Sequence, residues 1–248
     1  MLTAKVNIHG KVTAYNKHDI TDKQIENLKK VERKQKTYKL HKDAVKDAGV
    51  KLSQRTKKVW LLTPTTTIKD VKTANKALNL YLKNLIENYS LVNYVGVVEF
   101  QKNGNVHYHL LCEFDVNKIN IHKLNAAWCK ALGSVLNTTY FEPNALRVGG
   151  YAKNGRRYYY ITNVTHAIAY LTKYMSKGNG KYETKCYFIS SGIRVAPLII
   201  SDAYGVIDTV LSMSKKVFAL EYATIYMIDV NDAIKLYDYC LTDKTTQL

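Results

Sequence analysis

The chain has 248 residues and a formal net charge of +17, with 37 Lys and Arg against 20 Asp and Glu. Because 46% of the residues are hydrophobic, a chain of this length can bury a core, which excludes a disordered tail. The positive charge favours a polyanionic partner, since each phosphate that a basic side chain neutralises releases condensed counterions. Nucleic acid is the leading candidate, and an anionic membrane surface is the alternative.

Neither a membrane-spanning segment nor a signal peptide is expected. No apolar run approaches the roughly 18 to 20 residues that a spanning helix needs, and residues 1–15 lack an apolar core. We therefore expect a soluble, cytoplasmic protein. The cysteines are widely separated and form no CxxC pair, so we expect neither a zinc ribbon nor a disulfide framework.

The chain opens with a basic extension, residues 1–56, that we expect to be partly helical. Residues 21–49 are predicted to form a helix, with Thr21 and Gln24 in capping-box spacing ahead of a run of Lys and Arg. A helix that faces water and an arm that contacts DNA would explain this run of charge equally well.

A strand and an amphipathic helix follow. Residues 59–63 (VWLLT) predict a short apolar strand that ends before Pro64, and Thr67 with Asp70 is expected to cap the helix. The apolar face of this helix comprises Val71, Ala74, Leu78, Leu82, Leu85 and Tyr89.

Two strand-like runs, residues 94–101 and 106–114, then flank an Asn-Gly turn and predict a β-hairpin. Helices are predicted over 117–132 and 164–177, and strands over 158–162 and 185–190. The order βαββαβα is that of a split βαβ, RRM-like layer, so we expect an α+β fold with a central antiparallel sheet and flanking helices. Residues 201–248, strand-like over 217–228 and helix-like over 230–241, either complete the sheet or form an appendage.

His107 and His109 lie in the second strand of the hairpin. Alternate side chains of a strand point to the same face, so the two imidazoles could chelate one divalent ion. Glu99, on the neighbouring strand, could add the oxygen ligand that Mg²⁺ or Mn²⁺ prefers. A two-residue turn would pair Glu99 with Tyr108, on the wrong face, whereas a three-residue loop with Gly104 at a bulge pairs it with His107. We favour the three-residue loop.

The helix predicted over 164–177 carries two phenols and two ammonium groups. Tyr170 and Tyr174 are four residues apart on one face, and Lys173 and Lys177 each follow a tyrosine by three residues. Because tyrosine titrates near pH 10, a nucleophilic phenol needs a nearby positive charge or a base, and the lysines could supply the charge. The alternatives are an ordinary aromatic helix face and, for the histidines, satisfied core side chains.

Three motifs in this order resemble the HUH endonuclease superfamily of rolling-circle replication initiators. They are LLTPTTT (61–67), NVHYHLL (105–111) and YLTKYMSK (170–177), and the resemblance covers residues 59–197. The paired tyrosines are similar to those of the two-tyrosine initiators of phages and plasmids. The resemblance implies that residues 57–200 form the endonuclease domain, with the histidines on a central strand that faces the tyrosine helix.

The resemblance also implies a reaction: a tyrosine nicks single-stranded origin DNA in the presence of Mg²⁺ or Mn²⁺ and keeps the 5′ end covalently attached. Tyr174 is expected to attack first and Tyr170 second, because Leu171, Met175 and Lys177 frame Tyr174 in the family pattern. His166, one turn before Tyr170, competes with Glu99 as the third metal ligand. No GxxxxGK[ST] phosphate loop is present, so strand separation would need a host helicase or origin extrusion.

Three other functions fit parts of the pattern. A relaxase uses the same chemistry, but its tyrosine usually precedes the histidine motif. A single-tyrosine transposase has the order seen here and needs only one tyrosine. A noncatalytic nucleic-acid-binding protein would use Tyr158, Tyr159 and Tyr160 as a stacking surface, without explaining the metal-ligand pattern.

Overall fold

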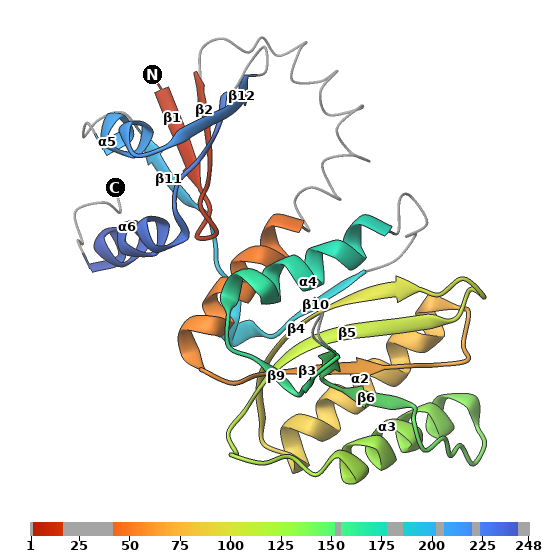
Figure 1. Cartoon of the computed structure of the whole chain (residues 1–248). Coiled ribbons are helices and arrows are strands. Elements are labelled where there is room, and N and C mark those ends of the chain that lie inside the picture. The colour runs from red at the N-terminus through yellow and green to blue at the C-terminus, as the bar shows by residue number, and fades with distance from the viewer. Residues whose placement is uncertain are drawn as a thin grey trace. The chain divides into compact units, whose positions relative to one another are not determined.

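The computed structural model describes residues 2–16, 42–151, 155–177, 186–201, 206–219 and 224–242 (Figure 1). The chain divides into two compact units: unit 1 contains residues 1–47 and 195–248, and unit 2 contains residues 48–194. Each has an antiparallel sheet with helices, which confirms the expected α+β class. The division at residues 56 and 200, into an extension, an endonuclease domain and a C-terminal segment, stays a prediction.

The main sheet of unit 2 has the strand order β10-β4-β5-β3-β6, with β9 also paired to β3, and every described pair is antiparallel. Its strands are β3 (Val59–Pro64), β4 (Leu91–Phe100), β5 (Val106–Phe114), β6 (Leu146–Val148), β9 (Tyr160–Ile161) and β10 (Tyr187–Ile189). A separate ribbon pairs β7 (Gly150–Tyr151) with β8 (Arg157–Tyr158), and a short 3₁₀ turn, η1 (Ser191–Ile193), follows β10. The hairpin β4–β5 therefore lies at the centre of the sheet.

Two capped helices, α2 (Val71–Asn88) and α3 (Ile121–Leu136), lie on one side of this sheet (Figure 1). The Asp70 side chain accepts a hydrogen bond from the backbone N–H of Thr73, so Asp70 is the N-cap of α2 and the predicted role of Thr67 as the cap is wrong. Helix α3 begins at residue 121 and not at 117, because the Asn120 side chain caps it.

The hydrophobic core lies between these helices and one face of the sheet. Tyr81 of α2 and Trp128 of α3 are fully buried and make an edge-to-face contact, and Trp128 makes another with Tyr108 of β5. The predicted apolar face of α2 is confirmed, since Ala74, Leu78, Leu82 and Leu85 are buried. Alternation along β5 thus sends Tyr108 into this core and leaves its two neighbours on the opposite face.

Helix α4 (Val164–Lys177) covers the opposite face, where it packs on β4 and β5 and buries Leu171 and Met175 (Figure 1). Its predicted bounds are confirmed. The strand predicted over 158–162 is instead broken into β8 and β9, with residue 159 between them.

Unit 1 contains a five-stranded sheet in the order β11-β1-β2-β13-β12. Its elements are β1 (Leu2–Val6), β2 (Lys11–Asn16), β11 (Leu198–Ser201), α5 (Val206–Ser212), β12 (Lys215–Ala219), β13 (Thr224–Met227) and α6 (Val230–Thr242). The single strand-like run predicted over 217–228 is thus two paired strands. Of the helix predicted over 21–49, residues 21–41 lie outside the described residues, and residues 42–55 are helical. None of the helices within the described ranges is long and apolar enough to cross a membrane.

Candidate functional site

The β4–β5 hairpin has the register that the three-residue loop predicts. Glu99 pairs with His107, and the backbone N–H of Gln101 donates to Asn105 O at 2.9 Å, which leaves residues 102–104 as the loop. Gly104 has φ +87°, a left-handed conformation that favours glycine. This register places Glu99 on the same face of the sheet as His107 and His109.

His109 is the most enclosed polar group on that face, only 5% exposed. Its Nε2 lies 2.7 Å from Glu99 Oε2, and its Nδ1 lies 2.8 Å from the hydroxyl oxygen of Tyr170. The ring of Tyr174 stacks on the imidazole, with centroids 3.6 Å apart and planes inclined by 11°. Side chains from β4, β5 and α4 thus meet around one imidazole.

The two tyrosines are also in contact with each other, with ring centroids 5.0 Å apart. The Tyr170 hydroxyl is hydrogen-bonded to Thr63 at the end of β3 as well as to His109. Burial, followed by the neighbouring Tyr174, raises the pKa of Tyr170 well above its usual value of 10. Tyr170 is therefore held as a neutral phenol between a strand and a histidine.

His107 is half-buried beside this cluster. Burial lowers its pKa from 6.5 to about 4, and His109 lowers it further while Glu99 opposes the shift. The uncharged imidazole is the form that binds metal ions, and this environment favours it.

The donor chemistry of Glu99, His107 and His109 suits Mn²⁺ or Mg²⁺, since two nitrogens and one carboxylate share one face. Over the described ranges, however, no three His, Cys, Asp or Glu side chains are arranged together as a metal site. Glu99 instead contacts His109 directly. An ion bound here would have to replace that hydrogen bond by bonds to itself.

The other predicted residues of α4 are less central. Lys173 is exposed, with Nζ 5.9 Å from the centroid of the Tyr174 ring. The side chain of Lys177 lies outside the described residues. His166 is exposed in the first turn of α4, so Glu99 is the one of the two rival ligands that contacts a histidine of the pair.

Two neighbours of the site were missed from the sequence. Thr63 bonds to Tyr170, and Arg147 of β6 pairs with Thr63 and contributes to the lowered pKa of His107. Thr63 belongs to the LLTPTTT motif, so strand alternation from a buried Leu62 could have placed it on the histidine face. Arg147 lies on a three-residue strand with no distinctive periodicity, and nothing in the sequence marks it.

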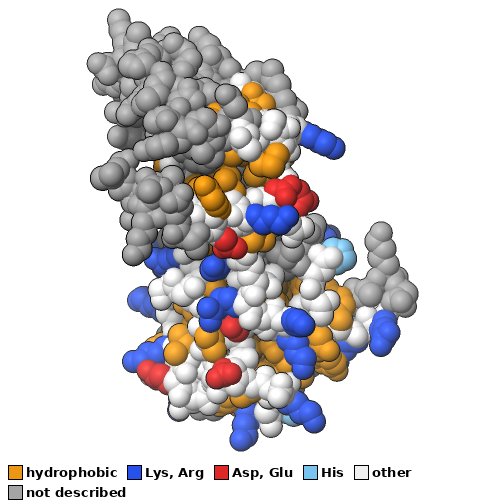
Figure 2. All heavy atoms as spheres, turned by 90° about the vertical axis from the view of Figure 1, so that its left-hand side faces the viewer, with side chains coloured by type: hydrophobic (Ala, Val, Ile, Leu, Met, Phe, Trp, Pro, Cys, Tyr) orange, Lys and Arg blue, Asp and Glu red, His pale blue; other side chains and the backbone are white. Residues whose placement is uncertain are grey.

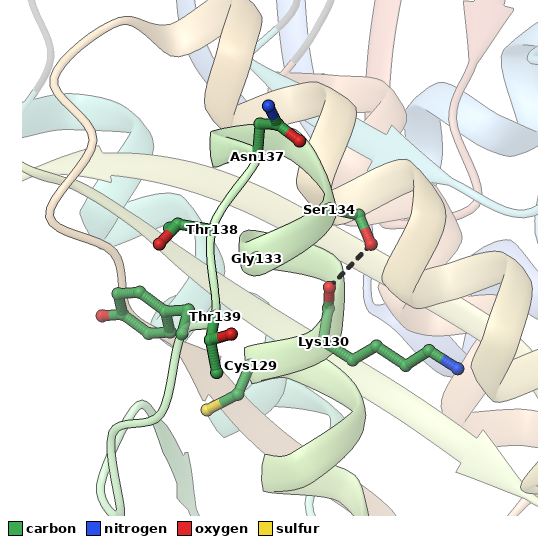
Figure 3. A pocket seen from close by; sticks show the side chains of 8 residues that line it. Cys129, Lys130, Gly133, Ser134, Asn137, Thr138 and Thr139 are labelled. Atoms are coloured by element: carbon green, nitrogen blue, oxygen red, sulfur yellow. Dashed lines mark hydrogen bonds between the residues drawn. The ribbon is translucent and has the colours of Figure 1, made fainter.

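The largest pocket over the described part of the chain, about 550 Å³, lies elsewhere, at the C-terminal end of α3 and in the loop that follows (Figure 3). Lys130, Ser134 and Thr138 are among its lining residues, and the Ser134 hydroxyl donates to the Lys130 carbonyl. Helix α3 packs on the core face of the sheet, so this pocket has no part in the histidine and tyrosine cluster.

Residues 57–179 match the family model of the replication-associated proteins of the ORF2 type. No curated protein and no solved structure gives a significant match. The matched segment contains β3 to β9 and α4, and with them Glu99, both histidines and both tyrosines. The match supports a family of Rep-like replication initiators for this chain.

Proposed function

We propose that this protein is a rolling-circle replication initiator of a plasmid or virus that nicks and rejoins single-stranded origin DNA through a covalent 5′-phosphotyrosine. The observation that carries the proposal is the contact of one buried histidine with a carboxylate and with two tyrosines of one helix. A core histidine needs a hydrogen-bond partner but no second phenol. A strand-transfer enzyme needs two nucleophiles at one site, and the family match to replication-associated proteins agrees with that requirement.

In the proposed nicking step, a phenol oxygen attacks phosphorus and the bond from phosphorus to the 3′ oxygen breaks. The phenol proton passes to the leaving oxygen, which becomes the new 3′-hydroxyl, and the 5′ phosphate stays on the tyrosine. Because the phosphotyrosyl bond keeps the energy of the broken ester, the reverse attack rejoins a strand without ATP. A second tyrosine allows the enzyme to cut the newly made junction before the first end is released.

Tyr174 is the better first nucleophile. The Tyr170 hydroxyl is already bonded to Thr63 and His109, and burial raises its pKa, so removal of its proton costs more. Lys173 lies beside the Tyr174 ring, where its charge would favour the developing phenolate, and Lys177 would act on the same face. Tyr170 would meanwhile orient His109 through its hydrogen bond until its own turn to react.

Glu99, His107 and His109 would hold a divalent ion, Mg²⁺ or Mn²⁺, with their two nitrogens and one carboxylate. When bound, such an ion polarises a non-bridging oxygen of the scissile phosphate. The hydrogen bond from Tyr170 to Nδ1 would fix the ring so that Nε2 faces the ion, the usual role of a second partner of a ligand histidine.

The charge of the chain supports a DNA partner. Lys and Arg side chains spread over the face seen in Figure 2, with acidic groups at few places among them. Since the sequence has no phosphate loop, a host helicase or an extruded origin in the host cytoplasm would supply the single strand.

The proposal is tested by incubating the purified chain with labelled single-stranded oligonucleotides from its replicon, with Mn²⁺ or with EDTA. We expect a protein–DNA adduct that survives denaturing electrophoresis, forms only with the metal and leaves a free 3′-hydroxyl. Binding without any adduct under these conditions would support a noncatalytic DNA-binding protein and refute the proposal.

A further inference from the structure

Four exposed residues of unit 2 form a cation–aromatic strip: Lys58, Arg157, Tyr159 and Tyr160. Tyr159 and Tyr160 are 39% and 40% exposed. The Arg157 guanidinium lies 4.9 Å from the centroid of the Tyr159 ring, and Lys58 Nζ lies 5.8 Å from that of Tyr160. Each exposed ring thus has a cation at its face, which is unusual for rings whose only role is to complete a core.

The backbone of the strip is fixed to β3. Tyr159 O accepts a hydrogen bond from the backbone N–H of Leu61, and Tyr160 pairs with Trp60. Gly149 has φ +81°, and a Cβ there would lie 1.8 Å from Tyr158 O, so only glycine permits the chain to cross so closely. The rings are therefore presented from a held segment, which reduces the entropy lost when a ligand binds.

The strip is close to the candidate site along β3. Leu61, which bonds to Tyr159, is two residues from Thr63, which bonds to Tyr170. Two residues of a strand span about 7 Å, and consecutive phosphates of one DNA strand are about 3.4 Å apart along a duplex axis. A DNA strand that leaves the tyrosines would reach the strip within a few nucleotides.

A hollow of about 350 Å³ continues from Lys58 and Trp60 and is also lined by Lys57 and Phe114. The edge of Trp60 meets the Tyr160 ring at 5.6 Å between centroids, so rings and hollow are continuous. Alternating cations and aromatic faces match a single strand, because every base has a face for stacking and each is followed by a phosphate. A duplex keeps its bases stacked internally and would use the cations alone.

We propose that the cation–aromatic strip binds the unpaired DNA next to the scissile phosphate, with Tyr159 and Tyr160 stacking on bases and Lys58 and Arg157 contacting phosphates. This inference rests on the proposed function, because it assigns the flanking strand of that substrate to named residues. The strip selects single-stranded over duplex DNA through the bases, whatever their sequence.

The test measures binding of a fluorescent single-stranded oligonucleotide by anisotropy in EDTA, so that no cleavage is required. Tyr159→Ala and Tyr160→Ala should each weaken binding about 5- to 150-fold, the range for loss of one stacked base. Tyr159→Phe, which keeps the ring, should restore the affinity, and Phe141→Ala, which removes a 74% exposed ring outside the strip, should leave it unchanged. Lys58→Gln and Arg157→Gln should each reduce the slope of log affinity against log salt by about 0.7.

A second measurement leaves the protein intact. Wild-type protein should bind an oligonucleotide with abasic sites in the flank more weakly, and Tyr159→Ala should then add little to the loss. Equal affinity for intact and abasic strands, or alanine variants that bind like wild type, would overturn the inference. If these binding results hold while wild type with Mn²⁺ forms no adduct, the strip stands and the proposed nicking activity fails. Normal adduct formation with unchanged binding in the variants would instead support nicking and refute the strip.

Discussion

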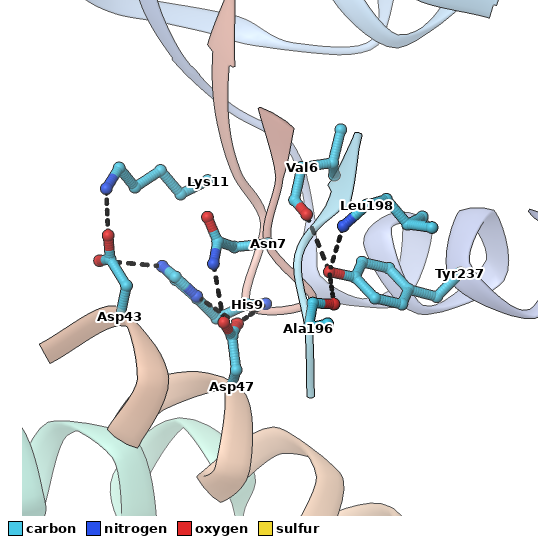
Figure 4. Close-up of polar contacts among 9 residues, drawn as sticks. All are labelled: Val6, Asn7, His9, Lys11, Asp43, Asp47, Ala196, Leu198 and Tyr237. Atoms are coloured by element: carbon cyan, nitrogen blue, oxygen red, sulfur yellow. Dashed lines mark hydrogen bonds and ion pairs between the residues drawn. The ribbon is translucent and has the colours of Figure 1, made fainter. Parts of the chain in front are cut away.

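His9 in unit 1 and His109 in unit 2 are both buried and both contact a carboxylate, but the groups around them differ. His9 Nδ1 lies 2.6 Å from Asp47 Oδ1, the His9 backbone N–H donates to the same oxygen, and Asn7 donates to the other at 2.7 Å (Figure 4). Asp43 lies 3.7 Å from His9 Nε2 and pairs with Lys11. This cluster joins the β1–β2 turn to residues 43–47 by charge and hydrogen bonds.

Tyr237 in unit 1 makes the same contrast with Tyr170. Its hydroxyl donates within 2.8 Å of Val6 O and accepts from the backbone N–H of Leu198 at 3.0 Å (Figure 4). Burial raises its pKa, as it does for Tyr170. The phenol of Tyr237 is bonded to backbone, whereas that of Tyr170 is bonded to a histidine beside a second tyrosine. Burial of a histidine or a phenol therefore indicates structure, and their convergence with a second phenol indicates chemistry.

The largest expected difference is in activity. His109→Ala should slow adduct formation about 10³-fold or more at saturating DNA, because a lost metal ligand removes several kcal/mol of transition-state stabilisation. His9→Ala should keep the wild-type rate per folded molecule. Single-turnover gel assays measure both, and equal losses in the two variants would erase the functional contrast between the two histidines.

In stability the order reverses. Asp47→Ala removes a carboxylate that is 2% exposed and leaves His9 and Asn7 without their partner, so the free energy of unfolding should fall by about 3–5 kcal/mol. Urea unfolding followed by circular dichroism measures this. Glu87→Ala breaks an exposed pair with Lys83 and should cost at most about 0.5 kcal/mol. An Asp47 variant as stable as the Glu87 variant would contradict a structural role.

Tyr108, between the two histidines on β5, sharpens the comparison within one strand. Its ring is buried in the core, and its hydroxyl donates to Asn75 Oδ1 at 2.9 Å. Tyr108→Phe should lower the free energy of unfolding by about 1 kcal/mol, the value of one hydrogen bond, and leave the nicking rate unchanged. A strong loss of rate would show that the two faces of β5 are not independent.

The smallest effect concerns an exposed carboxylate. Hydrogen bonds from the side chain and the backbone of Thr73 lower the pKa of Asp70 below 3.8, so the folded state favours its charged form. Its contribution is present above pH 3.8 and is lost as the pH falls through the lower folded-state value. Asp70→Ala should lower Tm by about 2–4 °C at pH 7 and by less at about pH 2.5. A gap that widens in acid would reverse the assigned sign.

The elements around the site could be predicted because their signals are local. The Asn103-Gly104 turn limits the hairpin to two registers, and the need to place Glu99 with His107 selects the one observed. Spacing of four residues likewise places Tyr170 and Tyr174 on one side of α4, where their rings touch.

What could not be predicted from the sequence depends on contacts between distant segments. Strand β1 pairs with β11, nearly 200 residues later, so the hairpin of residues 2–16 was assigned to an extension. The hydrogen bonds from Tyr170 to His109 and Thr63 arise from how α4 packs on three strands. Periodicity gives the face of a helix but neither its height over a sheet nor the partner of each hydroxyl.

The central claim is tested most directly by identifying the residue that becomes linked to DNA. Wild type, Tyr170→Phe, Tyr174→Phe and the double variant are each incubated with a labelled origin oligonucleotide and Mn²⁺, and the linked peptide is mapped by mass spectrometry. We predict that wild type is linked through Tyr174, that Tyr170→Phe still forms the adduct, and that the double variant forms none. Linkage through Tyr170 in wild type would reverse the order of the two nucleophiles, and an adduct in the double variant would contradict tyrosine chemistry on α4.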